Sequence, residues 1–153
     1  MNIVIFGSTG PSGQHLVRQA LDRGHHVTAF ARSPDKLDFT HERLTIAKGD
    51  ALDPDAVAGA IAGHDAVVSA LGMPPRDRSG LREKATRHIV SGMKQHGIDR
   101  LVVLSSYGVG DSRKHVPFFL RTMVIPVMLG PAFADMERME PVVRDSGLDW
   151  TLV

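Results

Sequence analysis

Cysteine is absent from this sequence of 153 residues, so disulfide bonds, thiolate metal sites and cysteine nucleophiles are all excluded. An excess of charge of one sign is absent too, because 18 lysines and arginines face 17 aspartates and glutamates and leave a formal net charge of +1. That balance gives no electrostatic reason to expect a nucleic acid or an anionic membrane surface as a partner. We expect neither.

A hydrophobic run of membrane-spanning length is also missing. The most apolar stretch, residues 116–133, is broken by Arg121, Pro126, Gly130 and Pro131, whereas a spanning helix needs about 20 apolar residues in a row. The first residues run directly into an apolar strand, without the charged start and longer apolar core of a signal peptide. The sequence therefore predicts a soluble, cytoplasmic protein, in which 116–133 lines a pocket or contacts a second subunit of a homodimer.

What the chain does contain is typical of one globular domain. Apolar residues make up 42% and charged residues 23% of the sequence, a composition that favours a packed core over disorder. The length suits a single domain spanning residues 1–153.

Short apolar segments alternate with amphipathic ones along the whole chain. Strands are expected at residues 2–6, 26–31, 43–48, 65–71, 100–106 and 148–153. Helical patterns fill the intervals at 11–23, from 54 to about 62, from 81 to a stop at 97, and in a segment that ends at 147. Strict alternation of strand and helix predicts an α/β protein with a doubly wound, Rossmann-type parallel sheet and helices on both faces.

Three glycines follow the first strand at a spacing of three residues, in the sequence GSTGPSG. Gly7 permits a sharp turn, Gly10 allows a ligand to approach the backbone, and Gly13 allows the helix to pack tightly on the strand. In a doubly wound sheet this turn binds pyrophosphate at the N-terminus of the helix. The loop residues expected to share this dinucleotide site are Thr9, Pro11 and Ser12.

The end of the second strand indicates which dinucleotide is bound. An acidic residue there would accept hydrogen bonds from the ribose hydroxyls of NAD, but this chain has Arg32 and Ser33. An arginine can bind the 2′-phosphate of NADP, with Ser33 and, more weakly, Lys36 assisting. The sequence therefore favours NADP(H) over NAD(H), although Asp35 leaves room for NAD and Arg32 can also be read as an ordinary surface charge.

Two further strand ends are expected to contribute to the same site. Asp50 and Ala51 follow the third strand, where the carboxylate would accept from the adenine amino group or would instead cap a turn. Ala70, Leu71 and Gly72 end the fourth strand, next to the first strand, where the strand order reverses. Ligands lie in that crevice, so we expect these three residues to contact the ribose or the nicotinamide.

The chain resembles the atypical short-chain dehydrogenases/reductases, in the NAD(P)H-binding group that includes biliverdin reductase B/flavin reductase and the NmrA-like proteins. The resemblance rests on GSTGPSG (7–13), Arg32, GDALD (49–53), DAVVSALG (65–72), LVVLSSYG (101–108) and SGLDWTLV (146–153). It implies binding of NADP(H) or NAD(H). Some members of the group reduce flavins, biliverdin or quinones, and others only sense the cofactor.

The resemblance also implies that a serine at the end of the fifth strand lies near the nicotinamide, here Ser106 or, next to it, Ser105. The catalytic Tyr-x-x-x-Lys pair of the wider dehydrogenase family is missing, because Tyr107 is the only tyrosine and position 111 is aspartate. A tyrosine that acts as general acid is therefore unsupported. Flavin- or quinone-type acceptors need less proton chemistry from the protein, and Tyr107 is interpreted as a pocket wall.

The loop after this strand offers candidate contacts to a substrate. Arg113, Lys114 and His115 would receive an anionic group, or are solvated loop charges. An apolar wall for a planar ring, or alternatively a core or dimer contact, is expected from Phe118, Phe119, Met123, Met128 and Met136. Of all these, Tyr107, His115 and Phe118 are the candidates for substrate binding. The histidines show no spacing typical of a metal site.

Two functions remain open from the sequence. One is NADPH-dependent hydride transfer to a flavin, quinone or related planar acceptor, and the alternative is a non-catalytic NAD(P)-binding redox sensor of the NmrA-like kind. A sugar-nucleotide epimerase would need the missing tyrosine. Because members of the group usually continue beyond the sixth strand, we expect the substrate-binding part after Val153 to be absent or truncated.

Overall fold

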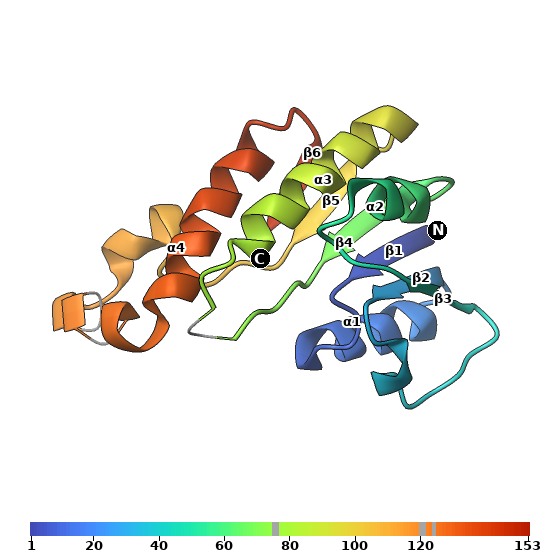
Figure 1. Ribbon diagram of the computed structural model, residues 1–153, viewed down its shortest axis with the longest axis horizontal. Coiled ribbons are helices and arrows are strands. Elements are labelled where there is room, and N and C mark those ends of the chain that lie inside the picture. Colours follow the sequence, from blue (N-terminus) through green and yellow to red (C-terminus); the bar gives the residue numbers. More distant parts are fainter. Residues whose placement is uncertain (75–76, 120–121, 124) are drawn as a thin grey trace.

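The structure, a computed structural model, describes residues 1–74, 77–119, 122–123 and 125–153, and it describes no side chains at 125–128. Arg121 and the side chains of Pro126 and Met128 therefore lie outside the described part. Six strands form one parallel sheet in the order β3-β2-β1-β4-β5-β6 (Figure 1). They are β1 (Asn2–Phe6), β2 (His26–Ala31), β3 (Leu44–Lys48), β4 (Ala66–Ser69), β5 (Arg100–Val103) and β6 (Asp149–Leu152). The expected doubly wound α/β fold is confirmed.

Helices lie where the sequence periodicity predicts them. They are α1 (Pro11–Asp22), α2 (Pro54–Ile61), α3 (Leu81–His96) and α4 (Ile125–Arg144), with short 3₁₀ turns η1 (Pro34–Lys36) and η2 (Gly110–His115). Gly97 ends α3 in the left-handed conformation, with φ of 66°, as a glycine after a helix commonly does. None of the helices in the described residues has the length and hydropathy needed to cross a bilayer.

Two predicted strand ends were too long. The fourth strand ends at Ser69 instead of residue 71, and the fifth ends at Val103 instead of residue 106. The backbone pairing of β5 with β4 stops at the pair Ser69–Val103, so the residues that follow leave the sheet. This places Leu71, Gly72, Ser105 and Ser106 in loops at the carboxyl edge, where they are available to a ligand.

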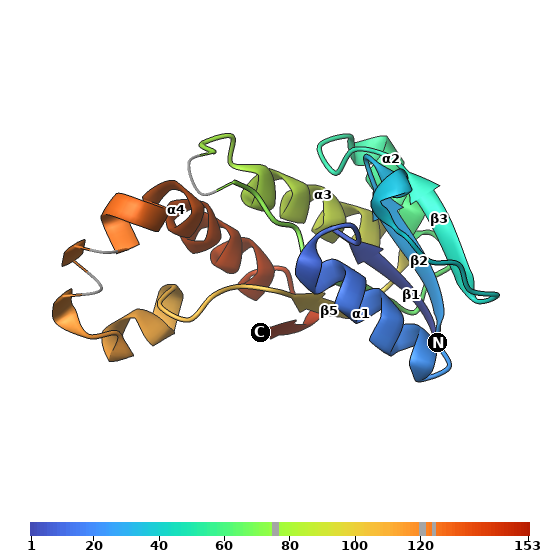
Figure 2. The same ribbon diagram turned by 90° about the horizontal axis from the view of Figure 1, so that it is seen from below.

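The two faces of the sheet are covered unequally. The larger apolar cluster joins β1, β4 and β5 to α2, α3 and α4, with Phe6, Ile89 and Met139 fully buried. The smaller cluster joins β1 and β2 to α1 through Ile5 and Val17. Figures 1 and 2 show α2, α3 and α4 on one side of the sheet and α1 on the other. Because β1 and β4 are neighbours, the strand order reverses between them, and a ligand crevice is expected at their carboxyl ends.

Between β5 and α4, the described residues of the segment 104–119 extend beyond the sheet in both views (Figures 1 and 2). The described residues between β5 and α4 carry the exposed apolar side chains of Tyr107, Phe118, Phe119 and Met123. In the same segment Val109 and Val116 are buried, so only part of it faces solvent.

Candidate functional site

Two of the three glycines in the loop after β1, Gly7 and Gly13, cannot be replaced by another residue without a clash. Gly7 has φ of +77°, and a Cβ on it would lie 2.5 Å from the carbonyl oxygen of Ala70. A Cβ on Gly13 would overlap the carbonyl oxygen of Gly7 and would lie 2.8 Å from its carbonyl carbon. By contrast, a Cβ on Gly10 would meet only the Gly7 oxygen, at 3.4 Å. Gly7 and Gly13 are thus needed by the fold, whereas Gly10 leaves space for a ligand.

The N-terminus of α1 has no side-chain cap. Its N-cap residue is Gly10, and no acidic residue stands in the first turn. In α2, by contrast, the Asp53 carboxylate accepts hydrogen bonds from the backbone N–H groups of Asp55 and Ala56. Helix N-termini attract anions through free N–H groups and the helix dipole. The start of α1 is therefore suited to hold an anion from outside the protein.

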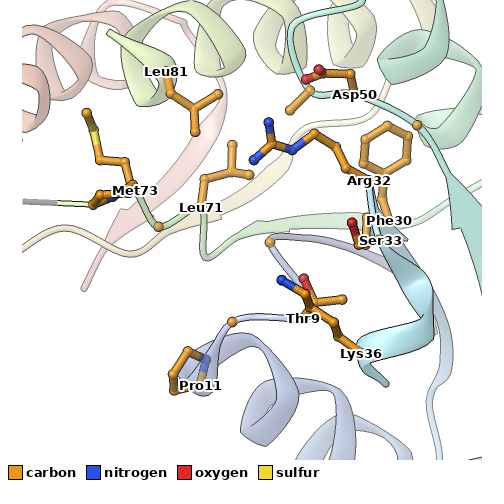
Figure 3. A pocket seen from close by; sticks show the side chains of 17 residues that line it. Thr9, Pro11, Phe30, Arg32, Ser33, Lys36, Asp50, Leu71, Met73 and Leu81 are labelled. Atoms are coloured by element: carbon orange, nitrogen blue, oxygen red, sulfur yellow. The ribbon is translucent and has the colours of Figure 1, made fainter. Parts of the chain in front are cut away.

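A first cavity of about 420 Å³ opens over the carboxyl ends of β1, β2 and β3. Figure 3 shows the side chains of Arg32 and Lys36 pointing into it from the end of β2 and from η1. The residues that line it are Gly7, Thr9, Gly10, Pro11, Phe30, Ala31, Arg32, Ser33, Lys36, Gly49, Asp50, Ala51, Leu71, Gly72, Met73, Pro74 and Leu81. Its size is within the range of small-molecule sites.

The charged groups of this cavity are arranged unevenly. Arg32 makes no ion pair with a described carboxylate within 4.0 Å, although the negative charge of Asp77 acts on it at longer range. One oxygen of Asp50, Oδ1, accepts a hydrogen bond from the backbone N–H of Leu52 at 3.0 Å, so Asp50 both caps a turn and lines the cavity. Asp35 is not among the lining residues. Cationic side chains therefore dominate the end of β2.

Some lining residues escaped the sequence analysis. Phe30 faces the cavity from β2, and a Cβ on Gly49 would lie 2.5 Å from its ring. In the GDALD motif, sequence reasoning identified Asp50 and Ala51 but not Gly49. Ser8 is buried, and its hydroxyl donates to the carbonyl oxygen of Phe30 at 3.1 Å, which ties the glycine loop to β2.

Met73 and Leu81 lie on the side of the cavity opposite Lys36 (Figure 3), and Pro74 also lines the cavity. Leu81 belongs to the helical pattern that starts at residue 81, but nothing in the sequence pattern connects Met73, Pro74 or Leu81 with a ligand.

A second cavity of about 210 Å³ continues from the first across the switch point between β1 and β4. The two share Gly10, Pro11, Leu71 and Gly72. The other residues lining the second cavity are Ser12, Ala70, Arg82, Leu104, Ser105 and Met136. Ser12 and Ala70 do not line the first cavity, but they line the second cavity and so belong to the same continuous site.

A third cavity of about 340 Å³ lies on the other side of Ser105, which lines both it and the second cavity. The Ser105 hydroxyl donates to Oε1 of Glu140 at 2.7 Å, and Nη2 of Arg144 donates to Oε2 of the same carboxylate at 3.2 Å. Arg144 also lies over the ring of Trp150, 5.5 Å from its centroid. The buried Glu140, from α4, therefore fixes the position of the Ser105 side chain.

Of the other residues predicted to contact the substrate, some line a cavity and others do not. Ser106 and Tyr107 line the third cavity with Ser105, although the Tyr107 side chain is largely exposed. His115 and Phe118 line none of the three cavities described above. Met136 does reach the second cavity. Sequence reasoning also missed Glu140, which lies 35 residues from Ser105 along the chain.

With this geometry in view, the chain can be compared with known proteins. A family model described as NAD(P)H-binding matches residues 7–153. The chain belongs to this NAD(P)H-binding family. The resemblance to atypical short-chain dehydrogenases/reductases is confirmed.

Among curated proteins, the photosystem II assembly factor Ycf39 of Synechocystis is 30% identical over 109 residues, which cover 69% of this chain and 33% of that protein. The chain spans about a third of the length of the first curated relatives it matches. ChuY of Escherichia coli O157:H7, described as an anaerobilin reductase, superposes with a TM-score of 0.82 at 22% identity, covering 99% of this chain and 71% of ChuY. A short-chain dehydrogenase/reductase from Veillonella parvula, solved with NADP, has a TM-score of 0.78 at 22% identity, with 99% and 67% covered. At such identities these structures support the fold.

Proposed function

We propose that this NAD(P)H-binding chain takes part in NADPH-dependent hydride transfer to a flavin, a quinone or a related planar acceptor. The observation that carries the proposal is the continuous pair of cavities, which runs from the cations at the end of β2, past the uncapped N-terminus of α1, to Ser105. An elongated dinucleotide with an anionic centre fits that order of groups.

The preference for NADP over NAD rests on Arg32, Ser33 and Lys36. The ribose hydroxyls of NAD are usually held by a carboxylate at this strand end, and Asp35 does not line the cavity. A 2′-phosphate would instead receive charge-assisted hydrogen bonds from the Arg32 guanidinium. We therefore assign the 2′-phosphate to Arg32, with Ser33 as a further donor and Lys36 as a supporting charge.

The remaining groups have distinct roles in binding. The backbone N–H groups at the start of α1, with Thr9, Gly10 and Ser12 around them, hold the pyrophosphate. Asp50 and Ala51 lie beside the adenine, and Ala70, Leu71 and Gly72 beside the ribose and nicotinamide. When bound, the reduced nicotinamide supplies the hydride. Because the Ser105 hydroxyl donates a hydrogen bond to Glu140, its oxygen lone pairs are left to accept a hydrogen bond from the amide of the bound nicotinamide, and this contact orients the nicotinamide ring.

The residues that line the second and third cavities, where the acceptor would bind, favour a planar acceptor. Among the described residues lining the second and third cavities, the one tyrosine is Tyr107, which is 67% exposed, and no lysine accompanies it. The tyrosine-lysine proton donor of alcohol and ketone reduction is therefore not formed there. Flavins and quinones accept hydride on a conjugated ring whose proton can come from water. ChuY, a structural neighbour, is described as a reductase of anaerobilin, which supports a reductase over a sensor.

The alternative is a redox sensor that binds the cofactor without turnover. It is favoured by the exposed apolar segment with Tyr107, Phe118, Phe119 and Met123, which is more apolar than a solvent-exposed loop requires.

The deciding experiment measures NADPH oxidation by the purified chain with FMN, a quinone and biliverdin offered in turn, while NADPH binding is titrated in parallel. Binding with turnover supports the reductase and ranks its acceptors. Binding without turnover supports the sensor. Absence of binding contradicts both, and Gly10→Val serves as the binding-deficient control.

A further inference from the structure

Arg82 is a buried cation that the proposed cofactor contacts do not use. It stands in the first turn of α3 and is only 7% exposed. Its Nε donates to the carbonyl oxygen of Leu71 at 2.9 Å. Its Nη1 is buried and, in the described structure, has no hydrogen-bond partner. A buried donor without a partner is uncommon and costs stability.

The neighbouring carboxylate does not satisfy this guanidinium. Asp135, fully buried on α4, accepts from the backbone N–H groups of Arg82 at 2.9 Å and of Glu83 at 3.3 Å, and so caps α3. Burial lowers the pKa of the Arg82 guanidinium, and the negative charge of Asp135 opposes that change. Arg82 thus remains a desolvated cation whose charge is only partly balanced.

The charge of Arg82 lies beside the second cavity. Arg82 lines the second cavity together with Ser12, from the uncapped first turn of α1, and with Ser105. Of the described residues that line this cavity, none is a carboxylate. Two independent features, a helix N-terminus and a buried guanidinium with a free donor, therefore make the cavity electropositive.

We propose that the second cavity is an anion subsite in which Arg82 donates to a phosphate or carboxylate oxygen of the bound ligand. The anion is either the nicotinamide-side phosphate of the dinucleotide or an acidic group on the acceptor. This inference rests on the proposed function for the identity of those ligands, but not for the anion preference itself. It makes Arg82 a specificity-determining residue.

The test uses two pairs of ligands that differ by a single phosphate, namely reduced nicotinamide mononucleotide against reduced nicotinamide riboside, and FMN against riboflavin. Dissociation constants are measured by fluorescence titration for the wild type, Arg82→Met and Arg82→Lys. In at least one pair we expect the wild type to bind the phosphorylated member about 10- to 100-fold more tightly, as for a charge-assisted contact. Arg82→Met abolishes that ratio, and Arg82→Lys retains part of it because the charge remains.

The ratio of the two dissociation constants within a pair shows whether Arg82 contacts the phosphate of the ligand or only holds the loop at Leu71 in place. Losing the Arg82–Leu71 hydrogen bond would weaken both members of a pair equally and leave their ratio unchanged. Arg87→Met is the matched control, because Arg87 lies on the same helix, is 61% exposed and carries the same charge. Its ratio should stay at the wild-type value.

The outcomes also distinguish the two possible sources of the anion. A ratio lost only with the nicotinamide pair assigns the subsite to the dinucleotide, and one lost only with the flavin pair assigns it to the acceptor. A wild type without phosphate preference in either pair, or an Arg82→Met variant that keeps the ratio, overturns the inference. If the wild type fails to bind NADPH but the flavin ratio depends on Arg82, the proposed function fails while the anion subsite stands.

Discussion

The first cavity, over β1 to β3, is walled mainly by residues that directly follow strands, whereas the second and third cavities depend on side chains from α3 and α4. In the first, Gly7, Arg32 and Asp50 come from three successive strand ends. In the others, Arg82, Met136 and Glu140 come from helices and meet Ser105 across up to 35 residues of chain. The proposed dinucleotide site in the first cavity is thus formed mainly by backbone turns, whereas the proposed acceptor side depends on how the helices pack.

This difference predicts which substitutions each part of the site tolerates, the first cavity on one side and the second and third cavities on the other. The glycine loop has fixed backbone contacts, so a single methyl group can disrupt it. The acceptor side is held by polar side chains whose partners can be replaced, so changes there are expected to alter ligand preference before they unfold the chain.

The largest expected effect comes from Gly13→Ala. The new Cβ would overlap the carbonyl group of Gly7, and neither backbone segment can move without separating α1 from β1. We expect a loss of about 3 kcal/mol or more in the free energy of unfolding, measured by urea denaturation, together with the loss of NADPH binding. A variant with the stability of the wild type would show that the loop can rearrange.

Gly10→Val sharpens that result within the same loop. Since a Cβ on Gly10 would meet only one atom, at 3.4 Å, the fold should be retained. The side chain would fill the space expected for pyrophosphate, so we expect the NADPH dissociation constant to rise at least about a hundredfold, or ~2.7 kcal/mol. Thermal unfolding within a few degrees of the wild type is the control. Unchanged affinity for NADPH would place the cofactor elsewhere.

Arg32→Ala tests the cofactor preference of the first cavity. Losing a charge-assisted contact to the 2′-phosphate should cost about 1.5–3 kcal/mol for NADPH, which is about 10- to 150-fold in the dissociation constant. NADH lacks that phosphate, so its affinity should change less than about twofold. Equal losses for the two cofactors would contradict the assignment.

The same contrast explains how far sequence reasoning reached. The glycine roles, Arg32 and the strand order follow from local rules, because each residue lies within a few positions of a strand end. Ser105 was placed through the family resemblance, but its partner Glu140 was not found, since nothing in the spacing connects residues 105 and 140. Arg82 appeared only as a position in a helix. His115 and Phe118 were predicted because their loop follows the carboxyl end of the fifth strand, but neither residue lines any of the three cavities.

Glu140→Ala tests whether ligand binding in the first cavity is independent of the side-chain contacts around the third cavity. It removes the acceptor of the Ser105 hydroxyl and one partner of Arg144, so we expect a loss of about 1–2 kcal/mol in the free energy of unfolding. The dissociation constant of 2′,5′-ADP, which would occupy only the first cavity, should stay within about twofold. Glu137→Ala is the control, because its ion pair with Arg113 is exposed on the same helix. A parallel loss of 2′,5′-ADP binding would mean that the first and third cavities are coupled.

The smallest effect is expected from Glu83→Gln, which breaks a link between α3 and α4. Oε1 of Glu83 accepts from Arg87 and Oε2 accepts from Arg138 at 3.0 Å. The hydrogen bond from Arg87, assisted by that from Arg138, lowers the pKa of Glu83 against the opposing effect of burial. A carboxylate with a lowered folded-state pKa stabilises the protein above its unfolded value and loses this contribution as the pH falls through the folded value.

The free energy of unfolding of Glu83→Gln should therefore be lower than that of the wild type by up to about 1 kcal/mol at neutral pH, as for a partly exposed ion-pair network. The difference should close as the pH drops below about 4. Urea denaturation at both pH values measures it, with Glu42→Gln as a control, since its pair with Arg43 is longer, at 3.7 Å, and Glu42 is highly exposed. A difference that persists in acid would assign the effect to packing, because the glutamine would then be compared with an equally neutral side chain.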